Sequence, residues 1–286
     1  MDLATRVASV LGSEVGRVHR LSGGCVADVV CADLNDGRRV VVKHGGDGFG
    51  VEALMLRALA SRSHLPVPAV LYDEPDLLIL EHIEHDGSRG PGLERHAAEL
   101  LAALHGVAGP AFGFDTDTGL GTDTLIGPLR QPCPPSRRWV EFFARHRLGH
   151  FGDAALEAGA ITASCRDRLR RLCDRLEDVL DEPEHPSLIH GDIWSGNVLC
   201  HRGRVAACID PALHYAHPEV ELAFITLFST FGEAFFDRYH ELRPIREGFF
   251  ETRRHVYNLY PLLIHAILFG GGYARQVEAT LGRVGA

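Results

Sequence analysis

The chain has 286 residues and a formal net charge of −9, so it can bury a substantial core but lacks the basic balance expected of a nucleic-acid-binding protein. Its seven cysteines form an odd set without C-x-x-C spacing, which argues against a disulfide framework or a zinc site and favours a reducing cytoplasm. The sequence shows neither the charged-then-apolar order of a signal peptide nor an apolar run long enough to span a bilayer, so no membrane association is expected.

The first eighty residues predict a small antiparallel sheet with two helices. Apolar residues at helical spacing predict a short amphipathic helix that ends at Gly12. A second apolar stripe predicts a helix over 50–61. Asn35-Asp36-Gly37 is a strong hairpin signal between two of the expected strands. Extended segments are expected at 16–21, 27–34, 38–44, 70–72 and 77–80.

A glycine pair and a lysine in this region indicate a phosphate site. Gly23 and Gly24 lie between the first two strands, where their backbone could approach phosphates closely, although an ordinary hairpin turn is the alternative. The apolar strand that follows ends at Lys43, as does the kinase strand whose lysine contacts the α and β phosphates. A solvated lysine at a strand end is the competing interpretation. Glu52, in the first turn of the next helix, could pair with Lys43 or could simply stabilise the helix N-terminus.

The rest of the chain predicts a mainly helical region. The segment 110–135 is expected to be loop-like and to carry substrate contacts, and His105 is expected to cap a helix. Helices are expected at 93–104, 138–150, 162–180, 218–231, 246–269 and 273–281.

The stretch from Leu188 to Leu199 carries the strongest chemical pattern. Apolar runs at 198–200 and 205–209 flank a polar His-Arg-Gly-Arg and predict a hairpin, which would make Asn197 and Asp210 neighbours. Amide and carboxylate oxygens side by side suit Mg²⁺. Asp192, at the other end of the loop, is then free to accept a proton from an attacking hydroxyl. The alternative is that both aspartates are only turn formers.

These residues also carry a family resemblance. His190-Gly-Asp-x-x-x-x-Asn197 followed by Ile-Asp210-Pro resembles the aminoglycoside phosphotransferase and choline kinase superfamily, relatives of the protein kinases. The finer wording, HGDIWSGN and then DPALHYAHPEVELA, resembles the fructosamine kinase (ketosamine 3-kinase) family, whose usual pattern is close to HGDLWSGN and DPAxYYGHREADLA. Trp194 is the residue that best distinguishes this family pattern, because the antibiotic-modifying relatives generally carry another residue there. Ile264 replaces a usual Asn, which suggests that substrate choice has drifted if that Asn touches sugar.

The resemblance implies an α+β, protein-kinase-like fold with two lobes. A nucleotide-binding lobe with a small antiparallel sheet would span residues 1–82, a hinge 83–91, and a larger, mainly helical catalytic and substrate-binding lobe 92–286. It further implies ATP and Mg²⁺ as cofactors and transfer of phosphate to the 3-hydroxyl of a free or protein-bound ketosamine, by a monomer or homodimer. The adenine edge would meet the backbone around Glu81, His82 and Ile83.

The same resemblance suggests roles for individual side chains. Asp192 would be the base, Asn197 and Asp210 the Mg²⁺ ligands, and Lys43 the phosphate contact, held in place by Glu52.

Four further residues are candidates with an open alternative. Trp194 would offer a flat wall to the sugar or would be a core residue that locks the loop. Either Glu219 or Glu221, the latter an Asp in the usual pattern, would meet the cationic amine of the substrate, or both would be structural carboxylates that accept backbone hydrogen bonds. Cys25 is a candidate redox brake beside the phosphates, with a buried inert thiol as the alternative.

Two other functions remain open from the sequence. The first is a kinase for another amino sugar or small alcohol. The second is a non-catalytic nucleotide-binding or scaffolding protein, which the presence of Asp192, Asn197 and Asp210 together disfavours.

Overall fold

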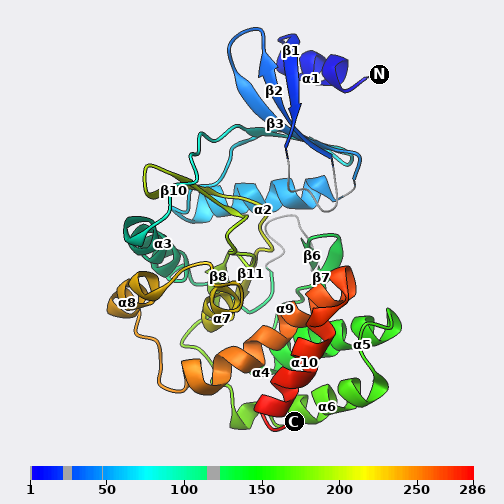
Figure 1. The fold of residues 1–286 in the computed structure, drawn as a ribbon, viewed down its shortest axis with the longest axis vertical. Helices are drawn as coiled ribbons and strands as arrows, with labels where there is room; N and C mark the ends of the chain where they lie inside the picture. The colour runs from blue at the N-terminus through cyan, green and yellow to red at the C-terminus, as the bar shows by residue number, and fades with distance from the viewer. Residues whose placement is uncertain (1, 22–27, 47, 115–122) are drawn as a thin grey trace.

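The computed structural model describes residues 2–21, 28–46, 48–114 and 123–286. Gly23, Gly24 and Cys25, on which the phosphate-loop and redox predictions depend, lie outside the described residues. Figure 1 shows a β-sheet at one end of the molecule and most of the helices at the other, with α2 (Phe49–Arg62) between them. The predicted α+β, two-lobed architecture is therefore confirmed.

A five-stranded antiparallel sheet forms the N-terminal end, with strand order β1-β2-β3-β5-β4. The expected strands are confirmed to within two residues, and the predicted Asn35-Asp36-Gly37 turn joins β2 and β3, with φ +89° at Gly37. Helix α1 (Leu3–Leu11) begins after Asp2, whose side chain accepts a hydrogen bond from Thr5 N, and ends at Gly12. The strands are β1 (Val15–Arg20), β2 (Asp28–Leu34), β3 (Arg39–His44), β4 (Val70–Glu74) and β5 (Leu77–Glu81).

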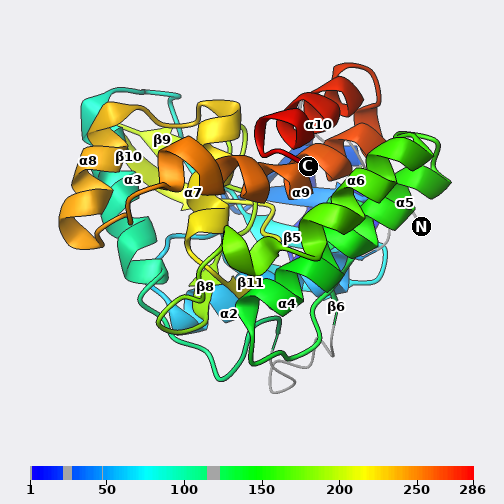
Figure 2. The same cartoon turned by 90° about the horizontal axis from the view of Figure 1, so that it is seen from below.

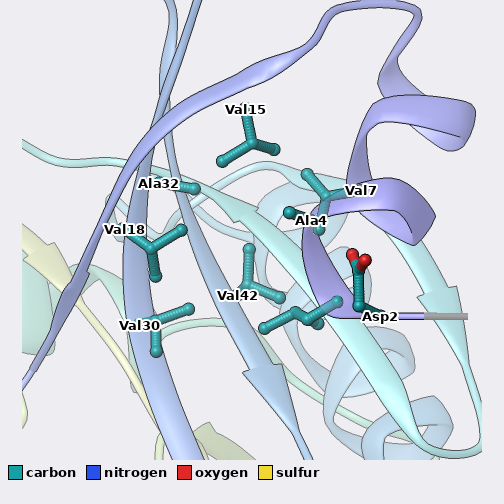
Figure 3. A pocket seen from close by; sticks show the side chains of 9 residues that line it. Asp2, Ala4, Val7, Val15, Val18, Val30, Ala32 and Val42 are labelled. Carbon is teal, nitrogen blue, oxygen red and sulfur yellow. The ribbon is translucent and has the colours of Figure 1, made fainter.

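The alternation of side chains along β3 separates two small cores. Val40 and Val42 pack on the face covered by α1, whereas Val41 packs on the face covered by α2. Lys43 therefore shares the α2 face. An apolar pocket of about 300 Å³ lies on the α1 face, where valines from the strands and from α1 point into one space (Figure 3). Because Val42 lines this pocket, it opens on the side of the sheet opposite Lys43.

The C-terminal part packs its helices around one large aromatic core. Trp139, Phe143 and Tyr257 are among its fully buried side chains. Seen from below, α7 lies between α3 and α8 on one side and the remaining helices on the other (Figure 2). Across the described ranges, none of the helices has the length and apolar character needed to cross a membrane. The helices are α3 (Pro91–Leu104), α4 (Trp139–Phe143), α5 (His150–Glu157), α6 (Ala163–Cys173), α7 (Glu219–Phe228), α8 (Glu233–Leu242), α9 (Arg254–Phe269) and α10 (Gly272–Arg283).

Several predicted boundaries in this part are wrong. The helix expected over 162–180 ends at Cys173, and a short 3₁₀ turn follows at 176–178. The helices expected over 138–150 and 246–269 each contain a π-helical stretch, at Ala144–Gly149 and Phe249–Arg253. Helix α8 was not predicted, and the segment expected to be loop-like contains a hairpin.

Three two-stranded sheets position the site. β8 (Ser187–Ile189) pairs with β11 (His214–Ala216), β9 (Val198–His201) pairs with β10 (Arg204–Cys208), and the unpredicted hairpin pairs β6 (Asp123–Ile126) with β7 (Leu129–Pro132). All three pairs are antiparallel. The predicted hairpin around residues 201–204 is thus confirmed.

The segment between β5 and α3 is bound to the β9–β10 hairpin. Asp86 N donates to Cys200 O (2.9 Å), and Asp86 Oδ2 accepts from Arg202 N (2.9 Å). Ser88 Oγ accepts from Gly203 N (2.7 Å). The chain is therefore anchored to the helical part from Asp86 onward.

Candidate active site

Residues 190–197 form a loop that links β8 to β9. Gly191 adopts φ +87°, and a Cβ atom there would lie inside the van der Waals distance of the Ala212 carbonyl oxygen. Only glycine fits this close approach without strain. Ala212 N in turn donates to His190 O (2.8 Å). The loop is therefore locked to the segment that follows Asp210.

Asp192 and Asn197 meet across this loop. Asn197 Nδ2 donates to Asp192 Oδ2 (2.8 Å) and to Asp192 O (3.0 Å). The sequence predicted that Asp192 and Asn197 lie at opposite ends of the loop. In space this is wrong, because a turn in which Asn197 N donates to Trp194 O (2.9 Å) brings the two side chains into contact. Within the described ranges no hydrogen bond reaches Asn197 Oδ1, so this oxygen is left as an acceptor.

The β9–β10 register brings Asp210 beside Asn197. Val198 pairs with Cys208, and Ile209 N donates to Asn197 O (3.0 Å), so Asn197 lies opposite the residue that precedes Asp210. Asp210 has φ +54°, which is uncommon for a residue other than glycine and is tolerated best by Asp and Asn. Backbone strain of this kind, of order 1–3 kcal/mol, often occurs at functional sites.

Lys43 joins the N-terminal sheet to this loop. Its Nζ lies 2.7 Å from Glu52 Oε1 and also forms an ion pair with Asp210. The Lys43 and Glu52 side chains are only 12% and 17% exposed. Burial alone would lower the pKa of Lys43, but the charges of Asp210 and Glu52 outweigh it and raise the pKa. Lys43 is therefore a fixed cation between two carboxylates.

The Asp192 carboxyl is strongly perturbed. Burial and the nearby charge of Asp210 raise the pKa of its carboxyl from 3.8 to about 7, and the hydrogen bond from Asn197 only partly opposes them. A carboxylate whose pKa lies near neutral pH is suited to accept a proton from a hydroxyl. Asp192 combines this basicity with a fixed orientation.

The oxygen atoms of Asn197 and Asp210 suit Mg²⁺. The Asn197 amide directs its NH₂ group to Asp192, which leaves its oxygen as an acceptor. The Asp210 side chain is 45% exposed, so its carboxylate can also be reached by a ligand. In the part of the chain that the structure describes, no group of three or more His, Cys, Asp and Glu side chains could hold a metal ion alone.

The residues expected to meet adenine follow β5. The strand ends at Glu81, whose N–H donates to Ala69 O (2.9 Å). Ile83 O accepts a hydrogen bond from His85 Nδ1 (2.9 Å), whereas the Ile83 N–H makes no hydrogen bond within the described ranges. Of the three predicted positions, Ile83 N–H is thus a donor that a nucleotide base could use.

Trp194 is not a core residue. Its side chain is 41% exposed, and its ring lies flat over Gly196, where a Cβ atom would overlap it. The alternative of a buried, loop-locking tryptophan is therefore excluded, and an exposed ring is available two residues from Asp192.

Glu219 and Glu221 are not placed to contact substrate as predicted. Glu219 forms a two-pronged ion pair with Arg253, with both oxygens 2.7 Å from its nitrogens. Glu221 accepts hydrogen bonds from Gly191 N (2.6 Å) and His105 Nε2 (2.8 Å). Both acids are buried because α7 lies inside the helical part, and this position favours the structural alternative.

No local pattern in the sequence indicated the partners of these two acids. Arg253 lies 34 residues from Glu219, and His105 lies 116 residues from Glu221. The position of a histidine in the last turn of a helix does not predict that it contacts a carboxylate far away in the sequence. Only packing of α3 against α7 reveals the contact.

A family model described as fructosamine kinase matches residues 2–285. The chain belongs to the fructosamine kinase family. A probable ketoamine kinase from Synechocystis is 35% identical over 96% of this chain and 94% of its own length. The chloroplastic protein-ribulosamine 3-kinase of Arabidopsis thaliana is 30% identical over 94% of this chain and 82% of its own length.

Solved structures agree with this assignment. A crystal structure named for a fructosamine-3-kinase of Thermobifida fusca superposes with a TM-score of 0.86 at 31% identity, covering 99% of this chain and 98% of that one. The aminoglycoside phosphotransferase APH(4)-Ia, at 18% identity and a TM-score of 0.69 over the full length of both chains, shares the fold. The protein-kinase-like fold expected from the sequence is confirmed.

Proposed function

We propose that this protein is an ATP-dependent kinase that phosphorylates the 3-hydroxyl of a ketosamine, in the repair of glycated amines. The observation that supports it is the convergence of Asp192, Asn197, Asp210 and Lys43 in a member of the fructosamine kinase family. The relatives named ketoamine kinase and protein-ribulosamine 3-kinase support the substrate class.

In this mechanism Asp192 orients the acceptor hydroxyl and takes its proton. The hydrogen bond from Asn197 Nδ2 (2.8 Å) fixes which carboxylate oxygen faces the substrate. Asn197 Oδ1 and Asp210 would hold Mg²⁺, which when bound supplies charge neutralisation at the phosphates.

Lys43 would hold the phosphates of ATP. Glu52 fixes its position at 2.7 Å and keeps it charged. The direct ion pair between Lys43 and Asp210 keeps the two groups close before any ligand binds. When nucleotide binds, Lys43 then shares its charge between Asp210 and phosphate oxygens.

Trp194 would receive the sugar. An exposed aromatic ring gives a flat apolar surface on which a sugar ring can stack, at about 0.5–1.5 kcal/mol beyond simple area burial. Trp194 belongs to the same loop as Asp192, so a sugar stacked on its ring would present a hydroxyl to the base. The backbone N–H of Ile83 would meet the adenine edge, and the chain would divide into nucleotide-binding and substrate-binding lobes at 83–91.

The test is a substrate panel with Mg²⁺ and ATP. Fructosyl-lysine and ribulosyl-lysine should be phosphorylated, with the product shown by NMR to carry phosphate on the 3-oxygen, whereas an aminoglycoside and choline should not. Asp192→Asn should lower kcat by about 10²–10⁴-fold while nucleotide still binds. Turnover of the aminoglycoside or choline alone would reject the ketosamine assignment, and near-normal turnover by Asp192→Asn would reject the mechanism.

A further inference from the structure

A chain of three short hydrogen bonds runs from helix α8 to the catalytic loop. The Tyr239 hydroxyl lies 2.7 Å from His105 Nδ1, and His105 Nε2 lies 2.8 Å from Glu221 Oε2. Glu221 Oε1 accepts from Gly191 N at 2.6 Å. The four residues come from the end of α3, the catalytic loop, α7 and α8, and α3 is far in the sequence from the other three (Figure 1).

Every side chain in this chain of hydrogen bonds is closed to solvent. His105 is 0% exposed, Glu221 1% and Tyr239 2%. Buried polar groups of this kind are costly unless each one has a partner. Here all the donors and acceptors are used, so the network is complete.

The protons can be assigned from the chemistry. Glu221 accepts on both oxygens, so His105 Nε2 carries a hydrogen and donates it. In the neutral ring Nδ1 then accepts, and the Tyr239 hydroxyl donates to it. Burial alone would raise the pKa of Glu221, but the hydrogen bonds from His105 Nε2 and Gly191 N help to lower it, which keeps the carboxylate ionised.

The chain ends on the backbone N–H of Gly191, the residue that immediately precedes Asp192. Gly191 has no side chain with which to fix its own position, and its φ of +87° is open to few residues. The Glu221 carboxylate is the group that directs its N–H. Small errors in the placement of a catalytic group are expensive, since about 1 Å can cost 10²-fold in rate.

We propose that Tyr239 and His105 are positioning residues for phosphoryl transfer, acting through Glu221 and Gly191 on the orientation of Asp192. This role rests on the proposed function, because it assumes that Asp192 is the base. Neither residue would touch the substrate or the nucleotide. Their removal should therefore lower kcat and leave both KM values unchanged.

The first test compares Tyr239→Phe with Tyr257→Phe. Tyr257 is a matched control, because it is also buried and its hydroxyl also makes a hydrogen bond, which it accepts from Trp139 Nε1 (3.2 Å) and which does not lead to the catalytic loop. Tyr239→Phe should lower kcat about fivefold, which is the change in rate expected when one hydrogen bond is lost. Tyr257→Phe should keep kcat within about twofold of wild type at a similar loss of Tm. Equal effects of the two variants on kcat would overturn the proposal.

A second pair of variants separates the hydrogen bond from the packing of the ring. In His105→Gln the amide can replace Nε2 and still donate to Glu221, so most of the activity should return. In His105→Leu the donor is lost, and kcat should fall by about 10²-fold. Loss of activity in both variants alike, with both folded, would show that His105 serves packing alone.

The amide proton of Gly191 gives a readout that needs no turnover. A short hydrogen bond to a carboxylate shifts this proton strongly downfield in NMR. The signal should move upfield in Tyr239→Phe and His105→Leu but not in Tyr257→Phe. If wild type phosphorylates no ketosamine while the Gly191 signal behaves in this way, the proposed function fails and the link to the loop stands. A signal that does not move in either variant overturns the positioning role.

Discussion

Replacing Asp192 by Asn should stabilise the protein, and the gain should depend on pH. In the folded protein, partial burial and the neighbouring charge of Asp210 raise the pKa of Asp192 from 3.8 to about 7. At low pH the Asp192 side chain carries its proton in both the folded and the unfolded chain, so it does not lower the free energy of unfolding. As pH rises above about 4, unfolded chains ionise while the folded protein keeps its proton until about pH 7. Folding stability is lost across this window and is constant above it.

The magnitude follows from that difference in pKa. At about 1.4 kcal/mol per pH unit, an acid shifted from 3.8 to about 7 costs up to about 4 kcal/mol at pH 8. At pH 5 the cost is only about 1.5 kcal/mol. Asparagine keeps the shape of the side chain and can still accept the hydrogen bond from Asn197, but it carries no charge. The stability advantage of Asp192→Asn over wild type should therefore grow by about 2.5 kcal/mol between pH 5 and pH 8.

Urea unfolding followed by circular dichroism at several pH values would measure this growth. Asp153→Asn is the control, because the ionisation of Asp153 should not make folding stability depend on pH between pH 5 and pH 8. Its hydrogen bond from Arg166 (2.6 Å) lowers its pKa below 3.8, so the stability it supplies is lost only in more acid solution. A difference between wild type and Asp192→Asn that stays constant from pH 5 to pH 8 would refute the argument that Asp192 is a buried, high-pKa base.

Three further substitutions test other parts of the site. Lys43→Met should weaken ATP binding at least about tenfold in calorimetry, because a charged contact to phosphate is lost; unchanged affinity would remove Lys43 from the nucleotide site. Gly191→Ala should lower the free energy of unfolding by more than about 2 kcal/mol, whereas Gly159→Ala, with φ +68° and open space around it, should cost only about 1 kcal/mol. Trp194→Ala should raise KM for a ketosamine about fivefold with unchanged ATP affinity; an unchanged KM would exclude sugar stacking.

Local patterns predicted the N-terminal sheet closely. Apolar runs and the Asn-Asp-Gly turn act over a few residues, so strand bounds could be inferred before any coordinates, whereas the pairing of Lys43 with Glu52 stayed open. The proximity of Asn197 and Asp210 followed from the same kind of reasoning, since a hairpin joins them. Recognising the His-Gly-Asp stretch then supplied the fold and the family.

Contacts that depend on long-range packing could not be predicted. The ion pair of Lys43 with Asp210 joins residues 167 positions apart. The pairing of β8 with β11 involves three residues on each side, too few for a periodic signal. The sequence motif also left open the roles of Glu219 and Glu221, because an acid in the first turn of a helix looks alike whether it faces a substrate or an arginine. Burial of α7 decided between them.

The hydrogen bonds that hold Asp86 and Ser88 to the β9–β10 turn restrict how the N-terminal sheet can move relative to the helices. Any rotation of the sheet against the helices has to involve the few residues between the end of β5 and Asp86, and also the segment after α2, where Pro66 O accepts a hydrogen bond from Cys208 N (2.8 Å). Residues His82 to His85 would then act as a short hinge. A proline or a bulky substituent there would alter nucleotide release rates while leaving the chemical step intact.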